Sequence, residues 1–165
     1  MNTSFQKTIG SDEWYTPKEM IDSLGEFDLD PCAPMNPLWK TAKVMYNKED
    51  DGLSKQWGGV RVWLNPPYSQ PLMTRFCERF VENGNGICLI FGRTGNKVFQ
   101  ELMLPKADAV LFLRKRVRFY KPTGEQGQSG GCDSVLFAFG EQNVGALRNC
   151  GLEGVLVPLK EARQI

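Results

Sequence analysis

The stretch Val60-Arg61-Val62-Trp63-Leu64-Asn65-Pro66-Pro67-Tyr68 decides the prediction of the fold. Its first five residues are largely apolar and include β-branched and aromatic side chains, which predicts a strand over 60–64. The two prolines end this strand because proline has no N–H to offer to a ladder. A segment with helical spacing begins at Ser69. The order of strand, tight turn and helix is where α/β enzymes place the groups that act on a ligand.

The turn Asn65-Pro66-Pro67-Tyr68 has a chemistry of its own. The prolines restrict the backbone, so a main-chain carbonyl and the Asn65 amide oxygen can point at the same spot. Both oxygens accept hydrogen bonds, and Tyr68 offers a flat aromatic face beside them. A planar group that carries an amino group, such as adenine, fits this layout. The alternative is a proline-rich turn that only ends a strand, and four residues alone do not decide between the two.

Helical and strand patterns alternate along the chain. Thr16-Pro17-Lys18-Glu19 is a capping box, which predicts a helix from Thr16 to Leu24. After Ser69, which we expect to cap the next helix, apolar pairs that begin at Leu72, Phe76 and Phe80 recur every four residues and mark one buried face. Further helices are expected over 96–104 and 141–150. Strands are expected over 27–30, 60–64, 86–91, 108–113, 134–139 and 154–159, and residues 117–120 either extend the fourth of these or follow it.

This alternation predicts a single doubly wound, Rossmann-like α/β domain with a mostly parallel sheet over residues 1–165. We expect residues 1–10 to be flexible, and residues 121–131, which are rich in Gly and Gln, to form a mobile loop. Ligands of such domains bind beyond the carboxyl ends of the strands. Asp30 and Asn65 both follow strand patterns, so we expect them at this edge of the sheet.

Composition narrows the class of protein. The chain has 165 residues, of which 41% are hydrophobic and 24% charged, and a net charge of +1. These values are typical of a globular domain, and the small net charge means that any contact with a polyanion comes from a local basic patch. No apolar run approaches the roughly 20 residues of a membrane span, and residues 1–10 lack the apolar core of a signal peptide.

Histidine is absent, and cysteine is present in a number that does not pair. Without histidine there is no His-based triad, general base or metal ligand, which disfavours most hydrolase chemistries. The five cysteines contain no CxxC pair, so we expect reduced thiols rather than a disulfide framework or a zinc site. We therefore expect no metal, and a location in the cytoplasm.

Four motifs follow one another along the chain. They are Asp12-Glu13-Trp14-Tyr15-Thr16-Pro17, Leu29-Asp30-Pro31-Cys32-Ala33, Glu49-Asp50-Asp51-Gly52-Leu53 followed by Trp57, and Arg61-Val62-Trp63-Leu64-Asn65-Pro66-Pro67-Tyr68. Taken in order, these motifs resemble those of the S-adenosylmethionine-dependent DNA adenine-N6 methyltransferases, and most closely the short phage-encoded ones. The match is in the residues themselves over 12–68. From there to about Gly140 it lies mainly in the order of elements and in Arg93-Thr94 and Arg116-Val117-Arg118-Phe119.

The resemblance implies a site for S-adenosylmethionine, whose cationic end and ribose hydroxyls suit carboxylates. Asp30 is the first candidate, and the segment Asp30-Pro31-Cys32-Ala33 would replace the usual glycine-rich loop, since no GxG follows it. The alternative for Asp30 is a turn-capping residue. Asp50 and Asp51 are candidates for the ribose or adenine end, or else form a solvated acidic turn. Trp14, Tyr15 and Thr16 would close over the methionine part, with Thr16 also capping its helix.

The implied reaction is direct transfer of a methyl group from sulfur to the N6 amino nitrogen of adenine. Asn65 and the Pro66 carbonyl would accept the amino hydrogens, Pro67 would hold the turn, and Tyr68 would stack on the base. Positioning of this kind supplies on the order of 7–11 kcal/mol and needs no strong base. Adenine in a duplex is out of reach, so we expect the base to be flipped out of the helix.

Contact with DNA is expected from one dense basic stretch, Arg114-Lys115-Arg116-Val117-Arg118-Phe119-Tyr120-Lys121. We expect its cationic side chains, Arg114, Lys115, Arg116, Arg118 and Lys121, to contact phosphates. Arg93, in a loop after a strand, is a second candidate. The alternative is a solvated basic edge that prevents aggregation.

Two other classes of function stay open. Similar motifs occur in methyltransferases that act on RNA bases or on a glutamine side chain of a protein. A non-catalytic nucleic-acid-binding relative is the other alternative, favoured only by the missing glycine-rich loop. Comparing methyl transfer to DNA, RNA and protein distinguishes the first alternative from a DNA methyltransferase. Titration with S-adenosylmethionine distinguishes the second, because a non-catalytic relative would not bind the cofactor.

Overall fold

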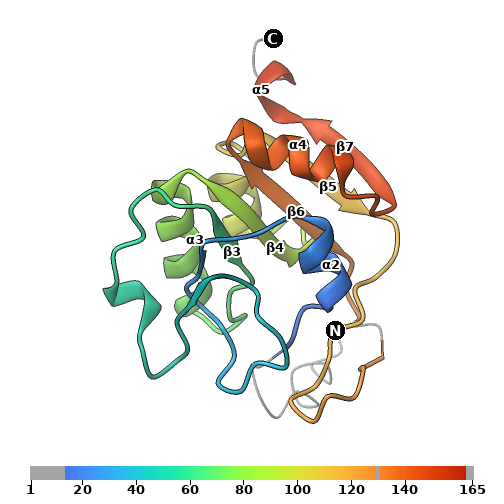
Figure 1. The fold of residues 1–165 in the computed structure, drawn as a ribbon. Helices are drawn as coiled ribbons and strands as arrows, with labels where there is room; N and C mark the ends of the chain where they lie inside the picture. The colour runs from blue at the N-terminus through green and yellow to red at the C-terminus, as the bar shows by residue number, and fades with distance from the viewer. Residues whose placement is uncertain (1–13, 129–130, 163–165) are drawn as a thin grey trace.

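A computed structural model describes residues 14–128 and 131–162 of the chain (Figure 1). The expectation for residues 1–10 lies outside the described residues. Seven strands form one sheet in the order β2-β1-β3-β4-β6-β5-β7. Their bounds are β1 Leu29–Asp30, β2 Val44–Met45, β3 Val62–Leu64, β4 Gly86–Phe91, β5 Ala109–Leu113, β6 Ser134–Phe139 and β7 Gly154–Pro158.

The sheet is mixed. β1 pairs in parallel with β2 and β3, and β3 pairs in parallel with β4, whereas the pairs β4–β6, β6–β5 and β5–β7 are antiparallel. It follows that β1 to β5 run in one direction and that β6 and β7 run in the other. The prediction of a single Rossmann-like α/β domain is confirmed, and most strands are parallel in direction. The sequence did not predict that β6 lies between β4 and β5. A pattern of buried apolar residues identifies a strand but does not give its direction.

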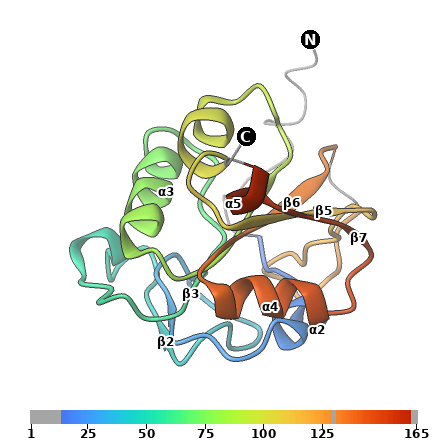
Figure 2. The same cartoon turned by 90° about the horizontal axis from the view of Figure 1, so that it is seen from above.

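Helices cover both faces of this sheet (Figure 2). One core lies between the sheet and the helical segments α3, η2 and α5, and the second core lies under α2 and α4. Residues of β3 alternate between the two: Val62 and Leu64 face the first core and Trp63 faces the second. The bounds are α2 Lys18–Ser23, the 3₁₀ turn η1 Gly52–Ser54, α3 Leu72–Asn83, the π-helical η2 Val98–Met103, α4 Glu141–Asn149 and α5 Leu159–Ala162.

Three local expectations were wrong. α2 begins at Lys18 after Pro17, with no side-chain cap, so Thr16 does not cap a helix. α3 begins at Leu72, three residues beyond Ser69, which contributes only its main-chain carbonyl to the first turn. Residues 117–120 do not form a strand, although Tyr120 makes isolated bridges. In each case the backbone is held by other contacts of the tertiary structure, which override a local pattern.

The irregular segment between β1 and β3 is tightly packed. A Cβ on Gly52 would lie 1.9 Å from the carbonyl oxygen of Pro31, so only glycine allows η1 to approach the turn after β1. The indole N–H of Trp57 donates to the carbonyl of Gly52 at 2.9 Å and fixes this approach. The acidic turn before η1 is thereby placed against the end of β1.

At the opposite end of β3, Arg61 joins several elements. Its side chain is buried, with Nε donating to Asn143 Oδ1 of α4 at 2.7 Å. Its two Nη atoms donate to the carbonyls of Glu26 at 2.8 Å and Leu24 at 2.7 Å, at the end of α2. The guanidinium carbon lies 4.2 Å from the centroid of the Phe27 ring. A single cation thus satisfies three acceptors from two separate parts of the chain.

We predict that Arg61→Ala lowers the free energy of unfolding by about 2–4 kcal/mol. Each buried acceptor left without a donor costs about 1–3 kcal/mol, and part of this cost is recovered by water. Urea unfolding followed by circular dichroism measures the change. Arg148→Ala, on the exposed face of α4, is the matched control and should change the free energy by less than about 0.5 kcal/mol. Equal effects of the two substitutions would contradict the role of Arg61.

Candidate active site

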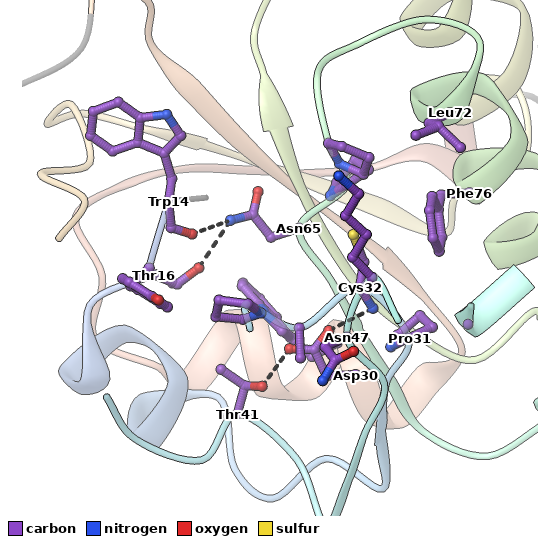
Figure 3. A pocket seen from close by; sticks show the side chains of 18 of the residues that line it. Trp14, Thr16, Asp30, Pro31, Cys32, Thr41, Asn47, Asn65, Leu72 and Phe76 are labelled. Atoms are coloured by element: carbon purple, nitrogen blue, oxygen red, sulfur yellow. Dashed lines mark hydrogen bonds between the residues drawn. The ribbon is translucent and has the colours of Figure 1, made fainter. Parts of the chain in front are cut away.

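A cavity of about 440 Å³ opens at the carboxyl ends of β1 and β3 (Figure 3). This volume is in the range of small-molecule sites. The structure brings most of the residues predicted for a cofactor and a catalytic turn to its wall. They are Trp14, Tyr15, Thr16, Asp30, Pro31, Cys32, Ala33, Asp51, Asn65, Pro66, Pro67 and Tyr68.

Asp30 is the last residue of β1 and is 3% exposed. Its Oδ1 accepts the backbone N–H of Cys32 at 3.0 Å, and its Oδ2 accepts the hydroxyl of Thr41. Burial raises the pKa of this carboxyl to about 6, although both hydrogen bonds act in the opposite direction. A carboxylate has about four lone-pair positions, so Asp30 can still accept hydrogen bonds from a ligand.

Asn65 follows β3 directly and carries an acceptor with no partner. Its Nδ2 makes long contacts with the carbonyl of Trp14 at 3.5 Å and with Thr16 Oγ1 at 3.4 Å (Figure 3). Because a carbonyl only accepts, the contact with Trp14 sets the orientation of the amide. Oδ1 is buried and, among the described residues, has no hydrogen-bond partner. Such an acceptor is costly to leave unpaired and suits an incoming N–H group.

The segment 14–16 forms one wall of the cavity and is held from outside. Tyr15 and Tyr120 exchange two backbone hydrogen bonds of 3.1 and 2.9 Å. The indole N–H of Trp39 donates to the carbonyl of Thr16 at 3.0 Å, and the Trp39 ring meets the Tyr120 ring edge-on at 5.0 Å between centroids. The wall next to Asn65 is therefore attached to the basic stretch itself, through Tyr120.

The two acidic residues before Gly52 have different positions. Asp51 lines the cavity in a left-handed conformation, with φ of 52°. Asp50 is exposed and does not line the cavity, and its Oδ2 accepts the backbone N–H of Asn47 at 2.9 Å. Asp50 thus lies in a solvated turn, which agrees with the alternative interpretation of the acidic cluster. Asp51 remains the candidate for contact with a ligand.

The basic stretch lies in an extended segment with alternating exposure. Val117 and Phe119 are buried, while Arg114, Lys115, Arg116, Arg118 and Lys121 are exposed. Three of these cations meet carboxylates: Lys115 pairs with Glu153 at 3.0 Å, Arg116 with Asp133 at 2.9 Å and Lys121 with Glu125 at 3.3 Å. Within the described part of the chain no ion pair involves Arg114 or Arg118. These two arginines are the cations most available to an external anion.

The loop expected over 121–131 contains backbone hydrogen bonds in its described part. Gly127 N donates to the carbonyl of Phe119 at 2.8 Å, and Lys121 N donates to the carbonyl of Glu125 at 2.9 Å. Arg93, the other candidate for DNA contact, is exposed and donates from Nε to Cys132 Sγ at 3.3 Å. It does not line the cavity.

Sequence reasoning missed several residues of the cavity wall. They lie in the irregular segment between β1 and β3, in β3 itself and on the first turns of α3, and they are Pro34, Trp39, Thr41, Asn47, Lys48, Gly52, Leu53, Trp63, Leu72 and Phe76. Gly52, Leu53 and Trp63 lie inside motifs but were not assigned to the site, and no motif marks the other positions. The apolar spacing along α3 gave a weak indication of two of these residues. Leu72 and Phe76 lie on the first turns of this helix, nearest the turn after β3, and this end of the helix faces the cavity.

Comparison with known proteins agrees with this geometry. The sequence pattern of the family described as "DNA N-6-adenine-methyltransferase (Dam)" matches residues 3–147. The chain belongs to this family. Its members use S-adenosylmethionine to methylate the N6 position of adenine in DNA, which confirms the predicted enzyme class, reaction and cofactor.

Two phage proteins named "DNA N-6-adenine-methyltransferase" are similar to this methyltransferase. The protein of Haemophilus phage HP1 is 25% identical over 148 residues, covering 84% of both chains. The protein of Escherichia phage T1 is 42% identical over 65 residues, which are 36% of this chain and only 26% of that protein. No solved structure matches the chain.

Two features of the described residues concern a membrane and a metal ion. No helix there is long and apolar enough to cross a membrane. No group of three or more side chains suited to a metal ion was found in the same residues.

The cavity residues fit S-adenosylmethionine. Asp30 offers a buried carboxyl whose raised pKa would fall on meeting a cation or a hydroxyl donor. Leu53, Leu72 and Phe76 offer an apolar wall for a heterocycle. The cavity wall therefore has both a charged and an apolar part, as the two ends of this cofactor require.

We predict that affinity for S-adenosylmethionine falls as the pH drops through 6. Below that pH the Asp30 carboxyl of the free protein is protonated, and the loss approaches about tenfold per pH unit. The same raised pKa means that the free energy of unfolding decreases as the pH rises from about 4 to 6, because the native state holds this proton more tightly. Calorimetric titration between pH 5 and 8 measures the affinity.

Asp30→Asn should bind the cofactor weakly and with no pH dependence in this range. Asp50→Asn is the matched control, since Asp50 is exposed and outside the cavity, and it should keep the profile of the parent. A parent-like pH profile in a folded Asp30→Asn variant would remove Asp30 from the cofactor site.

Proposed function

We propose that the cavity binds S-adenosylmethionine beside Asp30 and Asp51 and that the turn Asn65-Pro66-Pro67-Tyr68 receives the adenine. The observation that carries this proposal is the buried Asn65 Oδ1 without a partner at the end of β3. The N6 amino group of adenine is a donor of the kind that this acceptor lacks. Trp14 and Thr16, which orient the amide, line the same cavity, so the acceptor and the cofactor site share one wall.

The chemistry then requires mainly position. S-adenosylmethionine supplies an electrophilic methyl group on a sulfonium. Asn65 Oδ1 and the Pro66 carbonyl accept the two amino hydrogens, which favours a pyramidal nitrogen with its lone pair free. Cys32 acts as a packing residue beside Asp30, to which it donates its backbone N–H. As the N–CH3 bond forms and the S–CH3 bond breaks, S-adenosylhomocysteine would leave as a neutral thioether. The N6 cation is strongly acidic and would lose its proton to water, so no histidine base is needed, in keeping with a chain that has none.

The adenine reaches this turn after it is flipped out of the DNA helix, at a cost of a few kcal/mol. Tyr68 lines the cavity, and its ring offers a stacking surface for the base. Stacking on an aromatic side chain returns about 1–3 kcal/mol. Tyr68 therefore offsets much of the cost of flipping.

The DNA backbone is proposed to lie along the exposed side of the segment 114–121 and near Arg93. Arg114 and Arg118 project from this segment without an ion pair among the described residues, and Lys115, Arg116 and Lys121 add positive charge at its sides. The two backbone hydrogen bonds between Tyr15 and Tyr120 join this segment to the cavity wall. A duplex held here would thus lie next to the turn that takes its base.

None of the five cysteines forms a disulfide in the described part of the chain, which agrees with a reducing compartment. The enzyme is therefore proposed to act in the cytoplasm, which is the host cytoplasm if the chain is encoded by a phage.

Asn65→Ala should lower the rate of methyl transfer to DNA by at least about a hundredfold while cofactor affinity stays within a few-fold. Removing one group that stabilises the reacting atoms typically costs 10²–10³-fold in rate. Transfer of a radiolabelled methyl group to unmethylated DNA measures the first quantity, and calorimetric titration the second. Asn149→Ala, on the exposed end of α4, is the control. A loss of affinity that accounts for the whole loss of rate would place Asn65 at the cofactor instead.

Arg114→Gln combined with Arg118→Gln should flatten the dependence of DNA affinity on salt. Each phosphate contact on duplex DNA contributes about 0.9 to the slope of log affinity against log salt, so two lost contacts remove about 1.8. Fluorescence anisotropy at several salt concentrations measures the slope. Arg148→Gln controls for net charge. An unchanged slope would favour a solvated basic edge and move the DNA surface towards Arg93.

A further inference from the structure

The Tyr68 ring has an aromatic partner inside the protein. It stacks on the Phe91 ring with 4.2 Å between centroids and 12° between planes. Phe91 is the last residue of β4, the strand that pairs with β3, from whose end Asn65 projects. Tyr68 lines the cavity whereas Phe91 does not, so Phe91 supports the ring from outside the space that a ligand would fill.

No hydrogen bond fixes the Tyr68 ring among the described residues. Its hydroxyl is buried and lacks a partner there, and burial raises the pKa of the phenol. Buried tyrosine hydroxyls usually find a partner that orients the ring. In this enzyme the prolines of the turn restrict the backbone before Tyr68, and the ring itself packs against the first core and lies nearly parallel to the Phe91 ring.

Phe91 itself is firmly held. It is paired in register with Ser134 of the neighbouring strand β6. The guanidinium carbon of Arg93 lies 5.8 Å from the centroid of the Phe91 ring, and Arg93 Nε is 3.3 Å from Cys132 Sγ. A ring at the end of a central strand, with contacts of this kind, is a rigid support for the ring stacked on it.

We propose that Phe91 is a positioning residue for methyl transfer, which fixes the plane of the Tyr68 ring and thereby the angle at which the flipped adenine presents its amino group. The inference rests on the proposed stacking of adenine on Tyr68. Phe91 touches neither cofactor nor base, and it acts only through Tyr68. In-line transfer depends steeply on alignment, so a ring that is free to tilt lowers the rate of the chemical step without weakening the cofactor.

Phe91→Leu removes the stacking face and keeps an apolar side chain of similar size. We expect kcat for DNA methylation to fall roughly tenfold, as loss of an aromatic pair and of alignment implies, while the KM for S-adenosylmethionine changes less than twofold. Phe91→Tyr retains the ring and should restore kcat to within twofold of the parent. Rates are expressed per cofactor-binding site, counted by titration with S-adenosylhomocysteine, so that an unfolded fraction does not enter the comparison.

Phe112→Leu is the matched control, because Phe112 is a half-exposed phenylalanine on β5, and it should leave kcat unchanged. The inference is overturned if Phe91→Leu keeps the parental kcat, if its loss appears in the KM for the cofactor instead, or if Phe91→Tyr does not restore the rate. Asn65→Ala, measured in parallel, tests the proposed catalytic turn itself. The result for Asn65→Ala does not depend on the comparison between the two Phe91 variants, so failure of the proposed catalytic turn and failure of the role of Phe91 can be told apart.

Discussion

The parallel pairing of β1 with β3 is the constraint on which the active site depends. Leu29 lies opposite Val62 in this pair, so Asp30 and Asn65 emerge from the same edge of the sheet. Two short motifs that are far apart in the sequence therefore face one cavity. The close approach of Gly52 to Pro31 closes the wall of this cavity beside β1, since any larger residue would hold the two segments apart.

The polar groups at the two ends of β3 differ in whether they have hydrogen-bond partners. At its start, Arg61 is buried and each of its three donor directions meets an acceptor, so this end contributes to stability. At its finish, Asn65 Oδ1 and the Tyr68 hydroxyl are buried without partners among the described residues. Unsatisfied groups of this kind are disfavoured in a folded protein, and their presence in residues of a cavity wall supports the proposal of a ligand-binding site there.

The contacts around segment 14–16 join the basic stretch to the end of β3. On one side this segment orients the Asn65 amide, and on the other it pairs with Tyr120, which follows the exposed arginines. Trp39 strengthens both attachments through its indole N–H and its ring. The aromatic side chains here thus connect a charged surface to the Asn65 amide, while Phe91 stacks on Tyr68 of the turn after β3.

The sequence by itself determined the alternation of elements, the position of the turn Asn65-Pro66-Pro67-Tyr68 after a strand, and the family. The strands over 86–91 and 134–139 were predicted with their observed bounds, because continuous apolar runs flanked by glycine carry a strong local signal. Only the tertiary structure decided that β6 runs antiparallel between β4 and β5, that Thr16 faces Asn65 rather than capping a helix, and that Trp39 and Thr41 line the cavity. These features depend on contacts between residues distant in the sequence, and a local pattern of apolar and polar side chains carries neither the direction of a strand nor the identity of its neighbour.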